Sequence, residues 1–293
     1  MIFLFPLILG AWLAQSATPR AEEPRPLPEL TSFLQGVRKH LHSDRIILSR
    51  YTYLEQTNFR QLDSNGKARK TEVRVYEVYP SLDEHLTYRK LISRDGKPLS
   101  AEEIEKRDRA FDKRSGERQR KLEHESADER RRREAKEAEE KRKEEENLDE
   151  AFRLYKVTMI GREQREGQAV IALAFEPRPG YQPKTQEVKV LSKLRGKAWF
   201  GETDQELIRI EAELGSTLSF GLGVLAKLNQ GSQMVFQRRR VNDEIWLPSE
   251  SHFTGTGRIL VFKGFRVDVE TVYSDYKKFS VETSISYDRE KKP

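Results

Sequence analysis

The stretch Ala169-Val170-Ile171-Ala172-Leu173-Ala174-Phe175 decides the fold class, because it is a short, continuous run of apolar residues. It follows a turn at Arg165-Glu166-Gly167 and stops before a Pro-rich loop at 176–183. A run of this length between turn residues is typical of a β-strand that is covered on both faces. We therefore expect this strand at the centre of a β-sheet.

Strand-like segments surround this run and follow one another with few helices between them. Before it, 46–62 and 71–79 are rich in β-branched and aromatic residues, and Asn65-Gly66 between them favours a hairpin turn. A short helix is expected near 188–194, ending at Gly196. The remaining strand-like segments are 85–93, 153–161, 197–200, 206–214, 217–228, 233–241, 245–247, 251–262 and 265–279. Strand following strand predicts a mainly β protein of the α+β type with an antiparallel sheet.

A highly charged segment, 100–151, interrupts the strands. Between 101 and 150 it carries 19 acidic and 16 basic side chains, most of them strong helix formers. Ser100 followed by Glu103 is a capping-box pattern, and Ser115-Gly116 is a place where the helix could break. Its large apolar residues are too sparse for a coiled coil. We expect a solvated single helix or a helical hairpin, inserted into one domain that spans 29–293, with a partner-docking arm as the alternative.

The N-terminus has the features of an export signal. Residues 1–13 are almost wholly apolar, and the small residues Ala14 and Ser16 fit a signal-peptidase site. The apolar run is shorter than the ~20 residues that a spanning helix needs. We expect a signal peptide at 1–17, a flexible leader at 18–28, and a periplasmic or secreted protein. A helix should begin near Pro28, because apolar residues recur there at helical spacing.

Enzyme motifs are missing from the sequence. The chain has no Cys, its five His residues are scattered, and no Ser lies in a Gly-x-Ser-x-Gly elbow. Gly255-Thr256-Gly257 is half of a dinucleotide fingerprint, and its strand-to-strand setting favours a hairpin instead. We expect no metal, no cofactor and no catalytic site, although abundant carboxylates leave a glycoside hydrolase open as an alternative.

The net charge of +6 does not predict nucleic-acid binding. Outside the charged segment the basic residues are scattered through strand-like segments, and no nucleic-acid module frames them. A mildly basic surface is compatible with peripheral contact to an anionic membrane.

Several segments together resemble the LolA-like periplasmic carriers, which include the outer-membrane lipoprotein-sorting proteins. They are the export signal, the N-terminal helix before a long meander, the segment Leu194-Arg195-Gly196-Lys197-Ala198-Trp199-Phe200, and Val241-Asn242-Asp243-Glu244-Ile245-Trp246-Leu247-Pro248. The resemblance covers 30–99 and 152–279, and the charged segment departs from it. It implies an unclosed β half-barrel with a helix in its concavity and an apolar cavity for acyl chains.

Eight apolar residues are the candidates for lining such a cavity. They are Ile171, Leu173, Phe175, Trp199, Phe220, Leu222, Val224 and Trp246. The predicted function is binding or carrying a hydrophobic ligand, either a lipid or a lipoprotein, without catalysis. The alternative is a structural or regulatory envelope protein that engages a partner through the segment 100–151.

Overall fold

The computed structural model describes residues 25–41, 45–220, 226–259 and 263–278, so the predicted signal peptide and most of the leader lie outside it. The helices are α1 Leu30–His40, α2 Arg45–Leu48, η1 Glu84–Leu86, α3 Ala101–Glu123, α4 Ala127–Leu154 and α5 Gln186–Leu191. The first seven strands are β1 Tyr51–Leu62, β2 Ala68–Tyr79, β3 Tyr88–Arg94, β4 Lys97–Pro98, β5 Tyr155–Arg165, β6 Gln168–Pro177 and β7 Leu194–Gly201. The other six are β8 Leu207–Leu214, β9 Leu218–Phe220, β10 Ala226–Leu228, β11 Gln233–Val241, β12 Ile245–Ile259 and β13 Lys263–Lys278.

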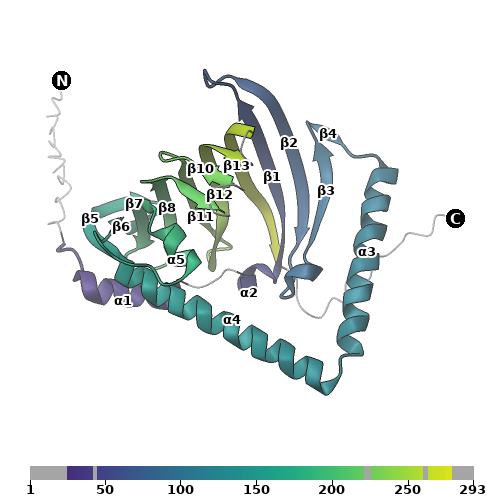
Figure 1. The fold of residues 1–293 in the computed structure, drawn as a ribbon, viewed down its shortest axis with the longest axis horizontal. Coiled ribbons are helices and arrows are strands. Elements are labelled where there is room, and N and C mark those ends of the chain that lie inside the picture. Colours follow the sequence, from purple (N-terminus) through teal and green to yellow (C-terminus); the bar gives the residue numbers. More distant parts are fainter. Residues whose placement is uncertain (1–24, 42–44, 221–225, 260–262, 279–293) are drawn as a thin grey trace, which may run out of the picture.

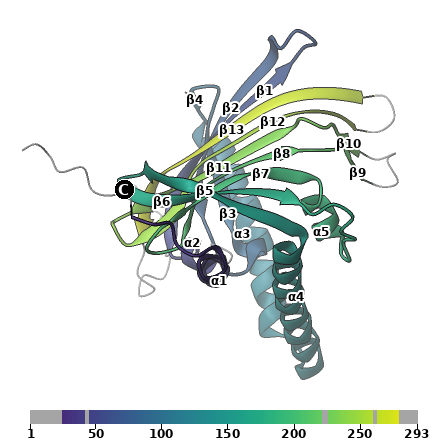
Figure 2. The same ribbon diagram turned by 90° about the vertical axis from the view of Figure 1, so that its left-hand side faces the viewer.

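All thirteen strands of the described chain belong to one antiparallel sheet. Its main path runs β4-β3-β2-β1-β13-β12-β11-β8-β7-β6-β5, and β10 joins it through β12. The two ends of this path do not pair, so the sheet stays open. Figure 2 shows it strongly twisted, with α1 and α4 on the same side of it. The prediction of a mainly β protein with an unclosed antiparallel sheet and helices packed on it is confirmed.

The first hairpin shows how local chemistry sets the register. Gly66 adopts a positive φ of 81°, which a residue with a side chain seldom adopts. The Asp63 carboxylate accepts hydrogen bonds from the backbone N–H groups of Asn65 and Lys67, at 2.9 Å each. The predicted turn at Asn65-Gly66 therefore joins β1 to β2.

Several predicted boundaries were wrong. The segment predicted as one strand at 217–228 contains two strands, β9 and β10, which pair with each other. The short helix predicted to end at Gly196 is α5, which ends at Leu191, and Gly196 lies in β7. The segment predicted to begin at 46 starts with helix α2, and β1 begins at Tyr51. The two late segments, 245–247 and 251–262, are one continuous strand, β12, as far as Ile259. Strand β12 passes through Pro248 because a register irregularity lies opposite, between Gln237 and Arg238.

The apolar run is a strand, β6, but its predicted central position was wrong. Strand β6 is second from the edge, next to β5. The strand is buried on both faces as predicted, since the consecutive residues Val170, Ile171 and Ala172 are each 0% exposed. Helices cover one face of this end of the sheet, while aromatic and charged side chains cover the other. Coverage on both faces therefore does not require a central strand.

The charged segment folds as two helices with an elbow between them, rather than as one helix or a hairpin. Helix α3 continues through Ser115-Gly116, and the break comes at Ser126, whose hydroxyl caps α4. Figure 1 shows α3 standing beside β3 and α4 running from the elbow towards α1 and α5. A charged side chain holds the elbow, because Arg133 of α4 donates to Glu125 of the elbow at 3.0 Å.

Candidate ligand-binding cavity

An apolar cavity of ≈ 280 Å³ lies between the helices and the sheet. Helices α1, α4 and α5 form one side, and β5, β6, β7, β8 and β11 form the other. Every residue that lines it is apolar except Tyr155. The lining residues are Leu34, Val37, Leu41, Leu148, Ala151, Phe152, Tyr155, Val157, Leu173, Phe175, Leu191, Leu194, Ala198, Phe200, Leu207, Ile210, Ala212 and Met234.

Tyr155 presents no free polar group to this cavity. Its hydroxyl donates a hydrogen bond to the carbonyl oxygen of Leu191 at 2.7 Å. Burial raises the pKa of this phenol above its usual range, because the charged form is poorly solvated there. The only hydroxyl among the lining side chains is therefore already satisfied, and the wall is apolar throughout.

A β-bulge in β8 turns two large apolar side chains towards the cavity. Phe200 pairs with Leu207 and Ala198 pairs with Ile210, so two residues of β8 face Trp199 alone. The extra residue brings Leu207 and Ile210 to the same face, although simple alternation would place them on opposite faces. The bulge thereby widens the apolar wall.

Helix α1 is capped at its first turn and tied to the turn before β8 at its last. The Glu29 carboxylate accepts hydrogen bonds from the backbone N–H groups of Ser32 and Thr31, at 2.7 and 2.8 Å. These bonds, with that of Ser32 the largest cause, lower the pKa of Glu29 to about 2. At the other end, His40 Nδ1 lies 3.3 Å from Glu206 Oε1 in the turn before β8. The predicted helix near Pro28 is confirmed as α1, and it packs through buried Phe33 and Val37.

The C-terminal end of α4 is anchored beside the cavity. Glu150, only 3% exposed, accepts a hydrogen bond from the backbone N–H of Lys184 at 2.7 Å. Thr185 donates to Asn147 at 2.8 Å, and Arg38 of α1 pairs with Asp149. These contacts hold the last turns of an otherwise solvated helix against α1 and the start of α5.

Helix α4 supplies Leu148 and Phe152 to the cavity wall. Neither is predicted from the sequence: Leu148 lies in the segment 100–151, which is expected there as a charged insertion, and Phe152 follows that segment directly. Their spacing of four residues, on one face just before a strand, was the available signal.

The structure separates the predicted cavity residues. Leu173 and Phe175 line the cavity, and Ile171 lies in the adjoining core with Phe33 and Phe200. Trp199 and Trp246 lie together on the opposite face of the sheet, in a core cluster with Ile208. The backbone of Phe220 ends β9. Leu222 and Val224 lie outside the described residues.

The two tryptophans have polar partners on that opposite face. Trp199 Nε1 donates to Glu163 at 3.0 Å, and the Arg165 guanidinium carbon lies 4.4 Å from the centre of the Trp199 ring. Trp246 Nε1 donates to Asp204 at 2.9 Å. Both indole N–H groups are satisfied, as is usual for buried tryptophans.

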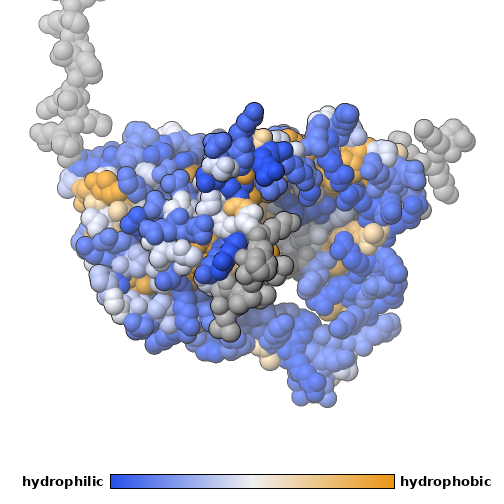
Figure 3. Space-filling view, turned by 45° about the horizontal axis from the view of Figure 1, so that its top comes forward, coloured by the Kyte–Doolittle hydropathy of each residue, from blue (hydrophilic) through white to orange (hydrophobic). Residues whose placement is uncertain are grey.

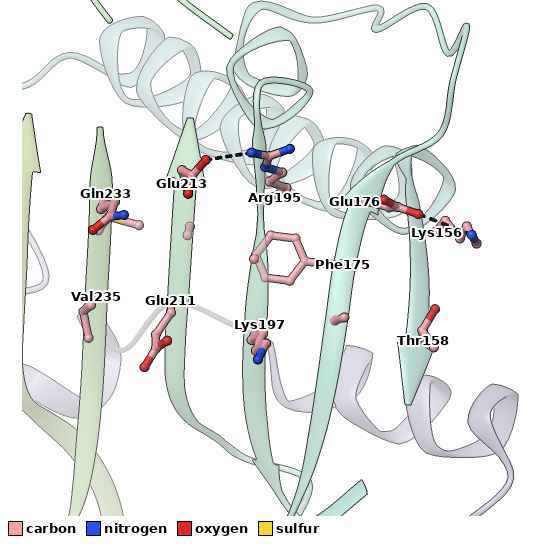
Figure 4. Close-up of a pocket in the computed structure, with 14 residues that line it drawn as sticks. Lys156, Thr158, Phe175, Glu176, Arg195, Lys197, Glu211, Glu213, Gln233 and Val235 are labelled. Atoms are coloured by element: carbon pink, nitrogen blue, oxygen red, sulfur yellow. Dashed lines mark hydrogen bonds and ion pairs between the residues drawn. The ribbon is translucent and has the colours of Figure 1, made fainter. Parts of the chain in front are cut away.

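Further along the same opposite face lies a polar pocket of ≈ 640 Å³ (Figure 4). Its charged side chains form cross-strand pairs: Arg195 donates to Glu213 at 2.8 Å, and Lys156 donates to Glu176 at 3.3 Å. Alternating acids and bases of this kind are typical of a solvated sheet face. The pairing favours no acid and base pointing at a common substrate position.

Within the described residues, no group of three His, Cys, Asp or Glu side chains could hold a metal ion. None of the described helices is long and apolar enough to cross a membrane. The surface in Figure 3 is mostly hydrophilic, with small, separate hydrophobic patches. The candidate ligand site of the described residues is the cavity under α1 and α4, because its lining is apolar.

The fold and the cavity define an open antiparallel β-sheet protein with helices packed on one face. No family model and no curated protein matches the sequence. Three solved structures similar to this chain are a lipoprotein-sorting domain, a DUF1329 family protein and MucB. The outer membrane lipoprotein-sorting protein domain from Vibrio parahaemolyticus is 12% identical, with 86% of this chain and 93% of that chain covered and a TM-score of 0.30. The DUF1329 family protein from Desulfovibrio piger is 13% identical, with 87% and 94% covered and a TM-score of 0.27. MucB in complex with MucA is 8% identical, with 86% and 100% covered and a TM-score of 0.23.

Proposed function

We propose that this protein binds a hydrophobic ligand, a lipid or the acyl chains of a lipoprotein, in the cavity under α1 and α4. The observation that carries the proposal is the chemistry of the lining: eighteen residues, all apolar apart from Tyr155, whose hydroxyl is already bonded to Leu191. Water needs two to four polar partners to occupy a buried site, and this wall offers none. An apolar ligand needs no polar partner.

The size of the cavity fits part of a lipid. At ≈ 280 Å³ it is about twice the ~150 Å³ of an engineered apolar cavity that takes up benzene. It lies just under the ~300 Å³ at which ordinary small-molecule sites begin. A segment of an acyl chain therefore suits it better than a whole phospholipid.

The proposal includes a non-catalytic role outside the cytoplasm. The apolar run at 1–13 followed by Ala14 and Ser16 supports export. The paired charges of the polar pocket, together with the apolar cavity, support binding rather than bond cleavage. Contact with a membrane surface belongs to the same proposal, since a carrier of lipids must load and unload at one.

Mass spectrometry of the native protein tests the proposal. Protein purified without detergent is extracted with organic solvent, and we expect a lipid or fatty acid in the extract. The variant Ala198→Leu places a larger side chain in the wall of the cavity and should co-purify with much less. Ala174→Leu on β6 is the matched control, because its side chain faces the polar pocket. Equal lipid in all three proteins, or none in the native one, contradicts the proposal.

A second candidate function is engagement of an envelope protein by the arm formed by α3 and α4. The specific observation is its exposure: α3 has no buried residue, and α4 has only Glu150 and Leu154. Exposed charged helices are costly to order for stability alone, since exposed ion pairs contribute little.

Charge reversal tests this second candidate without touching the cavity. Arg130, Arg131 and Arg132 lie on the exposed part of α4, far in sequence from the residues that line the cavity. Their replacement by Glu should abolish capture of a cross-linked envelope partner and leave bound lipid unchanged. Capture that survives the triple reversal counts against a docking role for this part of the arm.

A further inference from the structure

The apolar wall of the cavity continues on neighbouring strands of the sheet, as the strand register shows. Residues that face each other across antiparallel strands lie on the same face of a sheet. Starting from Ala212 in the cavity wall, the successive partners are Met234, Phe253, Val269 and Phe59. These five residues, which we name the apolar row, cross β8, β11, β12, β13 and β1, which lie side by side in Figure 1. The apolar surface therefore does not end at the cavity.

The row has a polar border along part of one side. From β12 to β1 its neighbours there are the hydroxyl residues Ser251, Thr271 and Thr57, and the two threonine hydroxyls lie 3.3 Å apart. On the other side the ring of Phe253 lies over Gly255, where an added Cβ would be only 2.6 Å from the ring, and Val267 faces Gly255. An apolar strip with hydroxyl groups along one edge suits a single extended chain that runs along it.

The row is only partly covered. Met234 is 40% exposed, and Phe59, Phe253 and Val269 are half-buried. None of these four belongs to a core cluster of the described residues. Apolar area left in water costs about 25 cal/mol per Å², which an apolar ligand on the row would recover.

Positive charge gathers where the row ends. Phe59 faces Glu72 of β2, and Lys70 and Arg74 flank Glu72 on the same face. Arg74 donates to Glu72 at 2.6 Å, and Arg94 faces Arg74 from β3. Three cations around one carboxylate leave an excess of positive charge that complements an anionic group.

We propose that the cavity and the apolar row together bind one amphiphile with a long, unbranched apolar chain and an anionic head group. The end of the chain lies in the cavity, its middle lies on the row, and the head group lies beside Lys70 and Arg74. This inference rests on the proposed function and deepens it. Five strand spacings of ~4.8 Å separate Ala212 from Glu72, so the chain, its head group and the side chains of Lys70 and Arg74 must together span about 24 Å.

Calorimetric titration with three probes tests this inference. Stearate has the long chain and the anionic head, octanoate has only the head and a short chain, and stearyl alcohol has only the chain. Delipidated native protein should bind stearate at least about tenfold more tightly than octanoate, because the additional methylene groups of stearate are buried on the row and in the cavity.

Two variants of β13 distinguish the row from general damage to the sheet. Val269→Glu places a carboxylate in the middle of the row, and it should weaken stearate binding at least about tenfold, more than it weakens octanoate binding. Val272→Glu is the matched control, since Val272 is 36% exposed and faces Gln56 on the opposite face. It should bind both probes like the native protein, and far-ultraviolet circular dichroism checks that both variants fold.

A variant of the basic residues at the end of the row tests the site of the head group. Replacement of Lys70 and Arg74 by Gln should weaken binding of stearate and not that of stearyl alcohol. Equal affinity of the native protein for stearate and octanoate, or full stearate binding by Val269→Glu, overturns the inference while the cavity proposal stands. If the native protein binds none of the three probes, and Ala198→Leu co-purifies with as much lipid as the native protein, the cavity proposal fails as well.

Discussion

Replacing Arg238 by Met should lower the free energy of unfolding more than a substitution of an exposed residue does. The Arg238 side chain is 7% exposed and joins two neighbouring strands to the turn before β8. It pairs with Glu206 at 3.0 Å and donates to the carbonyl oxygens of Leu207 and Trp246 at 3.2 and 2.8 Å. Removing one partner of a buried ion pair costs about 3–5 kcal/mol, because the other partners stay desolvated. We expect a decrease of that size in the free energy of unfolding.

Urea denaturation followed by tryptophan fluorescence measures this loss. Arg240→Met is the control, because Arg240 is exposed and the change should cost less than about 0.5 kcal/mol. In the double variant with Glu206→Gln, the loss should be smaller than the sum of the two single losses, since both changes remove the same ion pair. A loss below about 1 kcal/mol for Arg238→Met, or strict additivity, refutes the reasoning.

Three further predictions follow from single residues. Gly196→Ala should lower the free energy of unfolding by about 1–3 kcal/mol in urea denaturation, because an added Cβ would lie 1.9 Å from the Glu211 carbonyl oxygen. Gly161→Ala is the control and should be neutral, because an added Cβ there meets nothing within 4 Å. The carboxyl of Glu29 should titrate near pH 2 by NMR. Since its folded pKa is below the ordinary 4.5, its contribution to the stability of the folded state is complete above pH 4.5 and is lost as the pH falls towards 2. The phenol of Tyr155 should ionise above the usual pH in an ultraviolet titration, and a normal value would mean that water reaches it.

Local signals in the sequence were enough for the elements themselves. The continuous apolar run predicted the strand β6, Asn65-Gly66 predicted the hairpin of β1 and β2, and Ser100 with Glu103 predicted the start of α3. Each rests on contacts between residues close in the chain, which the sequence displays directly. The open antiparallel class followed from the order of the elements.

The composition of the cavity could not be predicted in the same way, because it depends on long-range register. The bulge in β8 brings Leu207 to the cavity face, and it puts two residues opposite Trp199, whose side chain lies on the other face. Leu148 and Phe152 reach the cavity only because α4 spans from the elbow to α5. Strand pairing between distant segments decides such positions, and periodicity within one segment does not.

The most direct test of an apolar ligand site under α1 and α4 is a crystal structure of the delipidated protein soaked with a fatty acid that carries bromine at the end of its chain. We expect the anomalous bromine peak among Leu173, Phe175 and Phe152, inside the cavity. A cavity closed by its own side chains, with bromine elsewhere or nowhere, would contradict the account.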